Sequence, residues 1–232
     1  MDTHVAKKTL DKIIGQIFGY QNPLTLEQAM AKFAFDIRLP QQVYDSTTNE
    51  PTWAASVNPT RFISLSNMKK RIAVDDWMLP PKKLTTLQEV IDAWAETNYT
   101  TTERQIESSD VWESDSVYNS ENVYRSIDVS RSKNVLFSDG IMDSEYIAAG
   151  QRSNTSNYCI RVEDSQNCSN SFNVIWSNKI TNCMLVQDCF DLYECMFCSH
   201  IAGKKYCIAN IQFEEEEYMK LKREVVQWVL TA

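Results

Sequence analysis

Residues 117–150 read VYNSEN VYRSID VSRSKN VLFSDG IMDSEY IAAG when they are divided into blocks of six. Val or Ile opens every block, and Ser, or finally Gly150, stands three places later. Past Gly150 the two roles are exchanged: small residues open the blocks, and Val162, Val174, Ile180, Val186 and Leu192 take the fourth position. This stretch is therefore an internal repeat in which every third residue belongs to a small set of apolar and small side chains.

A row at every third position fits neither an α-helix, whose period is about 3.6 residues, nor a strand, whose period is two. It fits a chain that bends every few residues and keeps turning the marked side chain toward one axis, which is a β-solenoid. Residues that accept tight backbone angles precede most block openers and predict corners there. They are Asn122, Asp128, Asn134, Gly140, Asp164, Asn170, Asn182 and Asp188. Coils of twelve and of eighteen residues both keep the row in phase.

All seven cysteines fall on the same row, at 159, 168, 183, 189, 195, 198 and 207. Because free cysteine behaves as a small buried hydrophobe, we predict that the cysteines are core residues, with no metal site. The predicted inner stack also contains Val117, Val123, Val129, Val135, Ile141 and Ile147. The alternative is a zinc-binding interaction module centred on Cys183 to Cys207. Its candidate ligands are Cys189, Cys195, Cys198, His200 and Cys207.

Disulfides are not expected, because the cysteine count is odd and residues 1–20 are amphipathic and lysine-bearing, unlike a secretory signal. A reducing, cytoplasmic compartment follows as the expectation. The net charge of −8 argues against a nucleic-acid partner. No apolar run approaches the length that a membrane span requires.

The front of the chain predicts helices over residues 3–20 and from Thr25 to about Ile37, the second with a capping box of Thr25 and Gln28. Short strands are predicted over 42–44, 53–57 and 61–65. A third helix, over 84–97, is expected to bury a stripe of Leu87, Val90, Ile91 and Trp94, and residues 99–110 are expected to form a linker.

The expected fold is α+β: a mainly helical N-terminal cap or docking domain (1–105), a β-solenoid (106–212) and a C-terminal amphipathic capping helix (213–232). An open solenoid end exposes unpaired strand edges, which is why caps are expected. Glu214–Glu217 stand at the N-terminus of the C-terminal helix, where negative charge is favourable. This helix carries the apolar residues Tyr218, Leu221, Val225, Trp228 and Val229.

Two features of the sequence could suggest an enzyme. Four loop acids would form a carboxylate cluster only if the fold brought them together, so we interpret them as solvated: Asp45, Glu50, Asp75 and Asp76. Hexapeptide-repeat acyltransferases have inward residues four and two apart and use a histidine base, whereas here the gaps are three and three. The chain offers only His4 and His200 as histidines. We predict no cofactor and no catalytic residue.

The segment Cys189-x5-Cys195-x2-Cys198, followed by Lys204-Lys205-Tyr206-Cys207-Ile208-x-Asn210-x-Gln212 and Glu216-Glu217-Tyr218, resembles a repeat terminus of uncharacterised β-solenoid proteins of tailed bacteriophages. The resemblance covers about the last forty residues and implies a phage context without implying an activity. We therefore predict a non-enzymatic structural or assembly protein, a virion component that is head-tail or tail-associated. The solenoid and its flanking helices would dock protein partners or further copies of the chain in a ring or trimer. The alternatives are the zinc-binding module and an acyltransferase-like enzyme.

Overall fold

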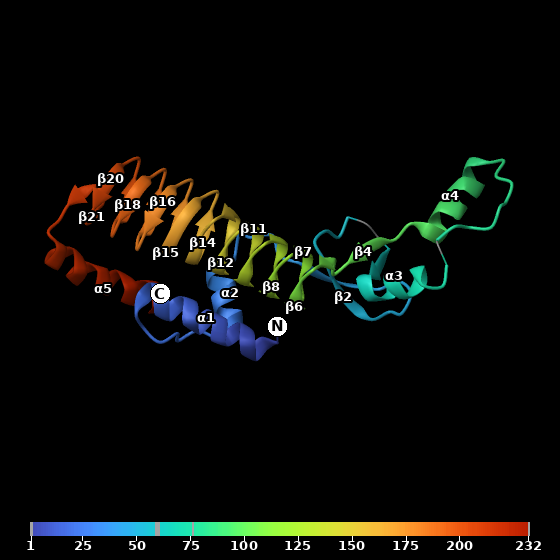
Figure 1. The fold of residues 1–232 in the computed structure, drawn as a ribbon, viewed down its shortest axis with the longest axis horizontal. Coiled ribbons are helices and arrows are strands. Elements are labelled where there is room, and N and C mark those ends of the chain that lie inside the picture. The colour runs from blue at the N-terminus through green and yellow to red at the C-terminus, as the bar shows by residue number, and fades with distance from the viewer. Residues whose placement is uncertain (1, 59–60, 76, 232) are drawn as a thin grey trace.

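The computed structural model describes residues 2–58, 61–75 and 77–231, which form an elongated molecule built around a β-solenoid (Figure 1). Residues 105–212 wind through about 9 turns. Each coil takes twelve residues, since Val129 pairs in parallel with Val117 in the coil before it and with Ile141 in the coil after it. The predicted α+β class with a central solenoid is confirmed, and the coil length left open by the sequence is twelve.

The solenoid strands are mostly four residues long and belong to one 18-stranded sheet. They are β5 (Gln105–Ile106), β6 (Ser109–Trp112), β7 (Asp115–Tyr118), β8 (Glu121–Tyr124), β9 (Ile127–Ser130), β10 (Lys133–Leu136), β11 (Asp139–Met142), β12 (Glu145–Ala148), β13 (Gln151–Asn154), β14 (Asn157–Glu163), β15 (Gln166–Ile175), β16 (Asn178–Thr181), β17 (Met184–Gln187), β18 (Phe190–Tyr193), β19 (Met196–Ser199), β20 (Ala202–Lys205), β21 (Cys207–Ile208) and β22 (Ile211–Gln212). All pair in parallel except the closing pair β21–β22. The first strands lie inside the stretch that the sequence predicted as a linker.

Each coil is a four-sided ring in which every side contributes three residues. From residue 107 to residue 209, every third residue has a positive φ and forms a corner. All eight corners predicted from Asn, Asp and Gly are confirmed, with φ from 44° at Asp164 to 73° at Gly140. The residue after each corner points into the lumen. The third residue of each triplet faces outward, so the triplet row in the sequence is the inner wall of the solenoid.

Corner geometry explains why valine is absent from the corners of the solenoid, because a β-branched side chain is strained at positive φ. Thr155, with φ 49°, is the one β-branched residue among the described corners. We expect Thr155→Asn to raise the free energy of unfolding by about 1 kcal/mol, measured by urea denaturation. The reverse change at an exposed corner, Asn119→Thr at φ 49°, should lower it by a similar amount. Equal stabilities for the two variants would contradict the assignment of strain to the corners.

The lumen holds four columns of stacked side chains, and serine in these columns completes the backbone hydrogen bonding. The Ser126 hydroxyl donates to the carbonyl oxygen of Tyr124 at 3.0 Å and accepts the backbone N–H of Ser138, one coil further on, at 3.1 Å. The same pair of bonds recurs at Ser120, Ser132 and Ser144. Each hydroxyl therefore satisfies an N–H that would otherwise be buried without a partner.

In residues 117–150 large and small side chains alternate around each coil, so opposite columns carry the same size class. After Gly150 large residues occupy the other two columns, one from Val162 and the other from Ile180, which is the exchange of roles seen in the sequence. A methyl group at Gly150 would lie 2.6 Å from Ile147 Cγ2 and 2.8 Å from Ile141 Cδ1. Glycine thus makes room for two isoleucines in that coil.

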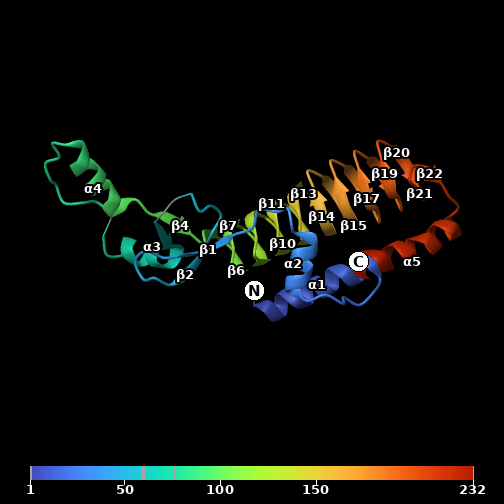
Figure 2. The same ribbon diagram turned by 180° about the vertical axis from the view of Figure 1, so that it is seen from behind.

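One outward side of the solenoid is apolar and is covered by helices α1 (Thr3–Phe18), α2 (Leu26–Phe33) and α5 (Glu215–Thr231) (Figures 1 and 2). Its residues recur every twelve positions: Tyr124, Leu136, Ala148, Ile160, Phe172, Met184 and Met196. The helices pack on it with Leu10, Ile13, Ile14, Phe33, Tyr218, Val226 and Val229. The helices predicted at the two ends of the chain are confirmed. They lie along the flank of the solenoid, whereas the sequence had placed them as end caps.

Ion pairs tie these helices to corner residues. Arg161 binds both carboxylate oxygens of Asp36 at 2.8 Å and donates to the carbonyl oxygen of Phe33 at 2.6 Å. This bond satisfies a carbonyl at the C-terminus of α2, which ends at Phe33, where Ala34 leaves helical geometry, and not at Ile37 as predicted. On α5, Lys222 reaches the buried carboxylate of Glu194 at 2.6 Å. The α5 stripe is shifted from the predicted one, because Val226 and Leu230 are buried and Trp228 is half-exposed.

The remaining elements extend beyond the N-terminal end of the solenoid. They are β1 (Gln41–Tyr44), β2 (Pro51–Ala54), β3 (Phe62–Ser64), α3 (Leu65–Ile72), α4 (Leu87–Thr97) and β4 (Thr100–Thr102). All three predicted strands are present, but β2 begins and ends earlier than the predicted 53–57, and α3, which was not predicted, begins at Leu65, inside the predicted third strand. The buried Asp115 joins this region to the first coil, since its carboxylate accepts from the backbone N–H groups of Ala55 and Arg104, both at 2.9 Å.

Candidate functional site

All seven cysteines are free and buried in the lumen, as the sequence predicted. Their thiols donate to carbonyl oxygens of the wall, as Cys168 does to Gln166 at 3.4 Å and Cys183 to Thr181 at 3.2 Å. The predicted inner stack of Val117, Val123, Val129, Val135, Ile141 and Ile147 is buried with them. The lumen is a packed core.

The candidate zinc ligands lie on both sides of the solenoid wall. Cys189, Cys195, Cys198 and Cys207 face inward. His200 is a corner residue whose side chain is 75% exposed and lies 3.7 Å from Asp188. Within the described residues, no three or more His, Cys, Asp or Glu side chains converge on a point where a metal ion would fit.

Burial raises the pKa of the Cys168 thiol to about 12, from an ordinary value of 9.0. The unfolded chain therefore ionises at lower pH than the folded one. The buried, neutral thiol therefore favours the folded state fully below about pH 9, and this stabilisation is lost as the pH rises toward 12. We expect the free energy of unfolding to fall over this window, measured by urea denaturation. The control is Cys168→Ser, because serine already occupies the equivalent inward position of the preceding coil, Ser156. This variant should show a shallower fall of the free energy of unfolding with pH. Ready reaction of Cys168 with a thiol reagent in the folded protein at pH 8 would contradict its burial.

Among the loop acids that the structure describes, Asp45, Glu50 and Asp75 do not form a cluster. Asp45 is buried and binds Thr47, the backbone N–H of Ser64 at 2.8 Å and the Asn67 amide at 2.8 Å. Burial opposes its ionisation, yet these hydrogen bonds together hold the pKa of Asp45 well below its usual range. Asp45 thus organises the loops around β3, contrary to its interpretation as a solvated acid.

Of the other three loop acids, Glu50 is exposed beside Thr48 and Asp75 is exposed within 3.7 Å of Arg71, as expected. Asp76 lies outside the described residues. The two histidines lie on separate elements: His4 is exposed on α1, and His200 is the exposed corner residue beside Asp188.

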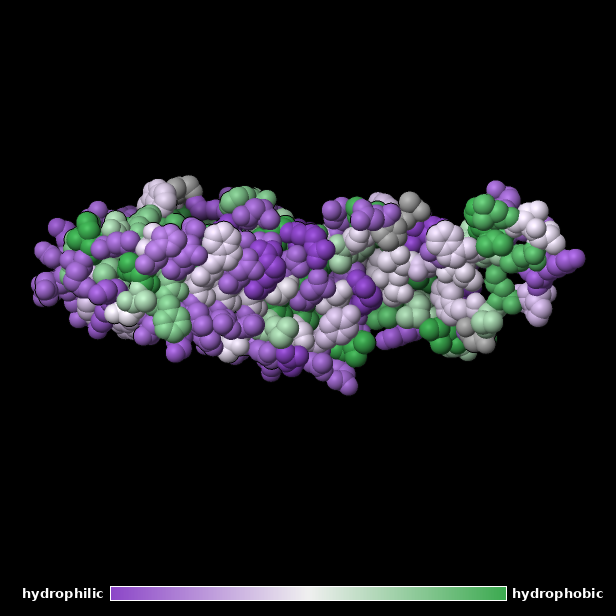
Figure 3. Space-filling model, turned by 90° about the horizontal axis from the view of Figure 1, so that it is seen from above, coloured by the Kyte–Doolittle hydropathy of each residue, from purple (hydrophilic) through white to green (hydrophobic). Residues whose placement is uncertain are grey.

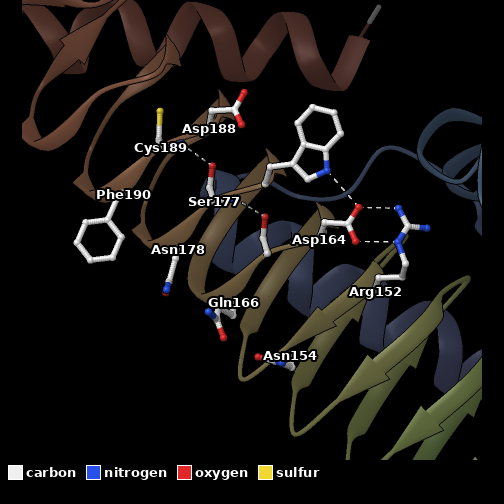
Figure 4. A pocket seen from close by; sticks show the side chains of 11 residues that line it. Arg152, Asn154, Asp164, Gln166, Ser177, Asn178, Asp188, Cys189 and Phe190 are labelled. Atoms are coloured by element: carbon white, nitrogen blue, oxygen red, sulfur yellow. Dashed lines mark hydrogen bonds and ion pairs between the residues drawn. The ribbon is translucent and has the colours of Figure 1, made fainter.

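A shallow, open groove of about 580 Å³ lies on an outward edge of the solenoid, parallel to its axis (Figure 4). One wall consists of the corner residues Arg152, Asp164, Trp176 and Asp188. The other consists of Asn154, Gln166, Asn178 and Phe190, each twelve residues after the last. The floor between them is backbone, because the intervening side chains Ser153, Ser165, Ser177 and Cys189 point into the lumen.

Three successive coils of the first wall are linked by hydrogen bonds. Arg152 binds both carboxylate oxygens of Asp164 at 2.7 Å, and the Trp176 indole N–H donates to the same carboxylate at 3.2 Å. The hydrogen bonds from Arg152 lower the pKa of Asp164. The indole is therefore fixed at its N–H edge, and yet the Trp176 side chain remains 56% exposed.

A second unusual surface is the face of α4. Leu87 is 75% exposed and Trp94 61% exposed, and Val90 and Ile91 are exposed beside them. Figure 3 shows this apolar surface at the end of the molecule that lies beyond the solenoid. The helix and its capping box of Thr86 and Glu89 are confirmed. The prediction that its apolar stripe is buried is wrong, because α4 projects away from the body of the chain and packs on little of it.

No match to this chain was found among protein-family models, curated proteins or solved structures. Across the described part of the chain, no helix combines the length and apolar character needed to cross a bilayer.

Proposed function

We propose that the protein is a non-catalytic component of a larger assembly, in which copies of the chain associate through an arm made of residues 65–97. The solenoid serves as a stiff spacer and the arm as the contact. The observation that carries this proposal is the exposed apolar face of α4.

An isolated helix of eleven residues is marginal in water, because helices of this length depend on packing of their apolar face. The face of Leu87, Val90, Ile91 and Trp94 is exposed in the single chain. Contiguous exposed apolar surface of this kind marks contacts with other macromolecules. Burial of this face by a partner supplies the packing that α4 lacks.

The charges of the arm favour a second copy as that partner. The last turn of α3 carries Lys69, Lys70 and Arg71, whereas α4 carries Glu89, Asp92 and Glu96 on the side away from its apolar face. Residues 65–97 have five basic and five acidic residues, although the whole chain has a net charge of −8. Opposite charges on α3 and α4 favour the approach of a second copy, because the basic α3 of one copy attracts the acidic side of α4 in another, while the apolar face of α4 supplies the contact.

The resemblance of the C-terminal segment to solenoid proteins of tailed bacteriophages supports placing this assembly in a phage particle. Long, stiff repeats suit that role, since each coil contacts its neighbours along the whole rod.

The test is the molar mass in solution, measured by size-exclusion chromatography with light scattering at micromolar concentration. We expect a small multiple of the chain mass of 26.8 kDa. A monomer at every concentration would refute self-association. Co-sedimentation with intact phage particles tests the virion role separately, and protein that never sediments with particles would argue against that role.

A further inference from the structure

We propose that the groove between Arg152 and Phe190 binds a linear, uncharged oligosaccharide that lies along the solenoid axis. This inference goes beyond assembly through the arm and does not depend on it. The groove is a built surface: one wall is fixed by hydrogen bonds, and the other presents side-chain amides (Figure 4).

Trp176 provides a flat apolar surface at the groove. Its indole N–H donates to the Asp164 carboxylate. The same carboxylate accepts hydrogen bonds from Nε and Nη2 of Arg152. A ring whose edge is fixed and whose face is exposed loses little freedom when a ligand stacks on it. The C–H face of a pyranose ring is such a ligand. Phe190, 46% exposed on the opposite wall two coils beyond Gln166, offers a second ring.

The opposite wall supplies polar groups suited to hydroxyls. The side-chain amides of Asn154 and Gln166 make no hydrogen bond within the described residues. The side-chain oxygen Oδ1 of Asn178 accepts from the side-chain amide of Asn167 at 2.9 Å. The side-chain N–H groups of Asn178 are therefore left for a ligand. An amide carries both donors and acceptors, and so does a sugar hydroxyl. Amides therefore suit hydroxyl groups without requiring a charge on the ligand.

The charges of the groove disfavour anionic polymers. Arg152 is neutralised by Asp164 and Glu163. Asp188 adds a carboxylate, with His200 at 3.7 Å. The groove therefore offers no surplus of positive charge, and a phosphate or uronate chain would meet repulsion.

The floor and the repeat distance disfavour a peptide strand. The floor N–H groups of Ser177 and Cys189 are bound by serine hydroxyls, and the floor carbonyls accept from the preceding coil, so no sheet edge is free. Equivalent side chains along the walls recur once per coil, about every 4.8 Å. This distance between equivalent side chains is close to the length of one sugar unit in an extended oligosaccharide. It does not match the rise of about 3.3 Å per residue of a peptide strand.

The test is isothermal titration calorimetry of the full chain with cellohexaose, xylohexaose and chitohexaose, and with hexagalacturonate as the anionic comparison. We expect at least one uncharged hexasaccharide to bind, and Trp176→Ala to raise its Kd by about tenfold or more. Trp112→Ala is the matched control, because Trp112 is a half-exposed tryptophan on another side of the same solenoid. It should leave Kd unchanged.

Three results would overturn the proposal: no binding of any of the three uncharged sugars, tighter binding of hexagalacturonate, or equal losses in the Trp176 and Trp112 variants. If Trp176→Ala does not fold, the double variant Asn154→Ala with Gln166→Ala replaces it, since these amides support no other side chain in the described structure. It should also raise Kd about tenfold, and an unchanged Kd would count against the site.

Discussion

Val129→Asp is expected to lower the free energy of unfolding by about 3–5 kcal/mol. Val129 is fully buried and is stacked between Val117 and Ile141 in the coils on either side. The substitution removes apolar burial and places a carboxylate in a lumen where neighbouring hydroxyls already serve the backbone. Urea denaturation measures the loss. If the variant does not fold, Val129→Ala, which only leaves a cavity, should still cost about 1–2 kcal/mol.

Arg131→Asp is the control for this change, two residues further along the same coil. Arg131 is exposed, and its ion pair with Asp143 at 2.7 Å is exposed as well. Loss of such a pair, with the repulsion that replaces it, should cost no more than about 1 kcal/mol. Equal losses for the Val129 and Arg131 variants would mean that the row of every third residue is not the inner wall.

Leu87→Glu is expected to return the assembly to the mass of one chain. Leu87 is the first residue of α4 and the most exposed member of its apolar face, and at 75% exposure it contributes little to the stability of the single chain. A carboxylate there would have to be desolvated on association, which apolar contacts cannot compensate. The measurement is light scattering on the eluting protein, with circular dichroism to show that the helix content is kept.

Gln88→Glu is the matched control, since it adds the same charge to the next residue, on the polar side of the helix. Gln88 is exposed and its amide binds Asp92 at 2.8 Å. The control should keep the mass of the parent protein. If the Leu87 variant also keeps an oligomeric mass, association does not use α4, and the arm has no part in it.

The inner wall and the corners could be predicted from sequence because both obey steric rules local to one triplet. Positive φ excludes β-branched side chains from the corners, so Val and Ile collect at the other positions, and Thr155 is the exception that remains. The cysteines share the inward positions for the same reason as valine: they are small and apolar.

The coil length and the helix-covered side were missed, although a signal exists. The outward positions that follow Tyr124 at intervals of twelve are Leu136, Ala148, Ile160, Phe172, Met184 and Met196. A period of eighteen would mix these apolar residues with polar ones. Examination of the outward positions, in addition to the inward row, would have fixed the coil at twelve and identified the side to which α1, α2 and α5 bind.

The α4 prediction failed for a different reason. An amphipathic pattern shows which face of a helix is apolar, but it does not show what covers that face. The groove likewise depends on side chains twelve residues apart, such as Arg152, Asp164 and Trp176, whose hydrogen bonds follow from the coil length. Asp45 could not be identified as buried, because its partners Ser64 and Asn67 are distant in sequence.

The four-sided coil sets a rule for how this chain can lengthen or shorten without losing its fold. A change of three residues keeps the corners but moves large side chains onto the columns of small ones. A change of six restores those columns but turns the apolar flank, from Tyr124 to Met196, away from its helices. Only whole-coil steps of twelve preserve both, so we expect viable length variants of this protein to differ by multiples of twelve.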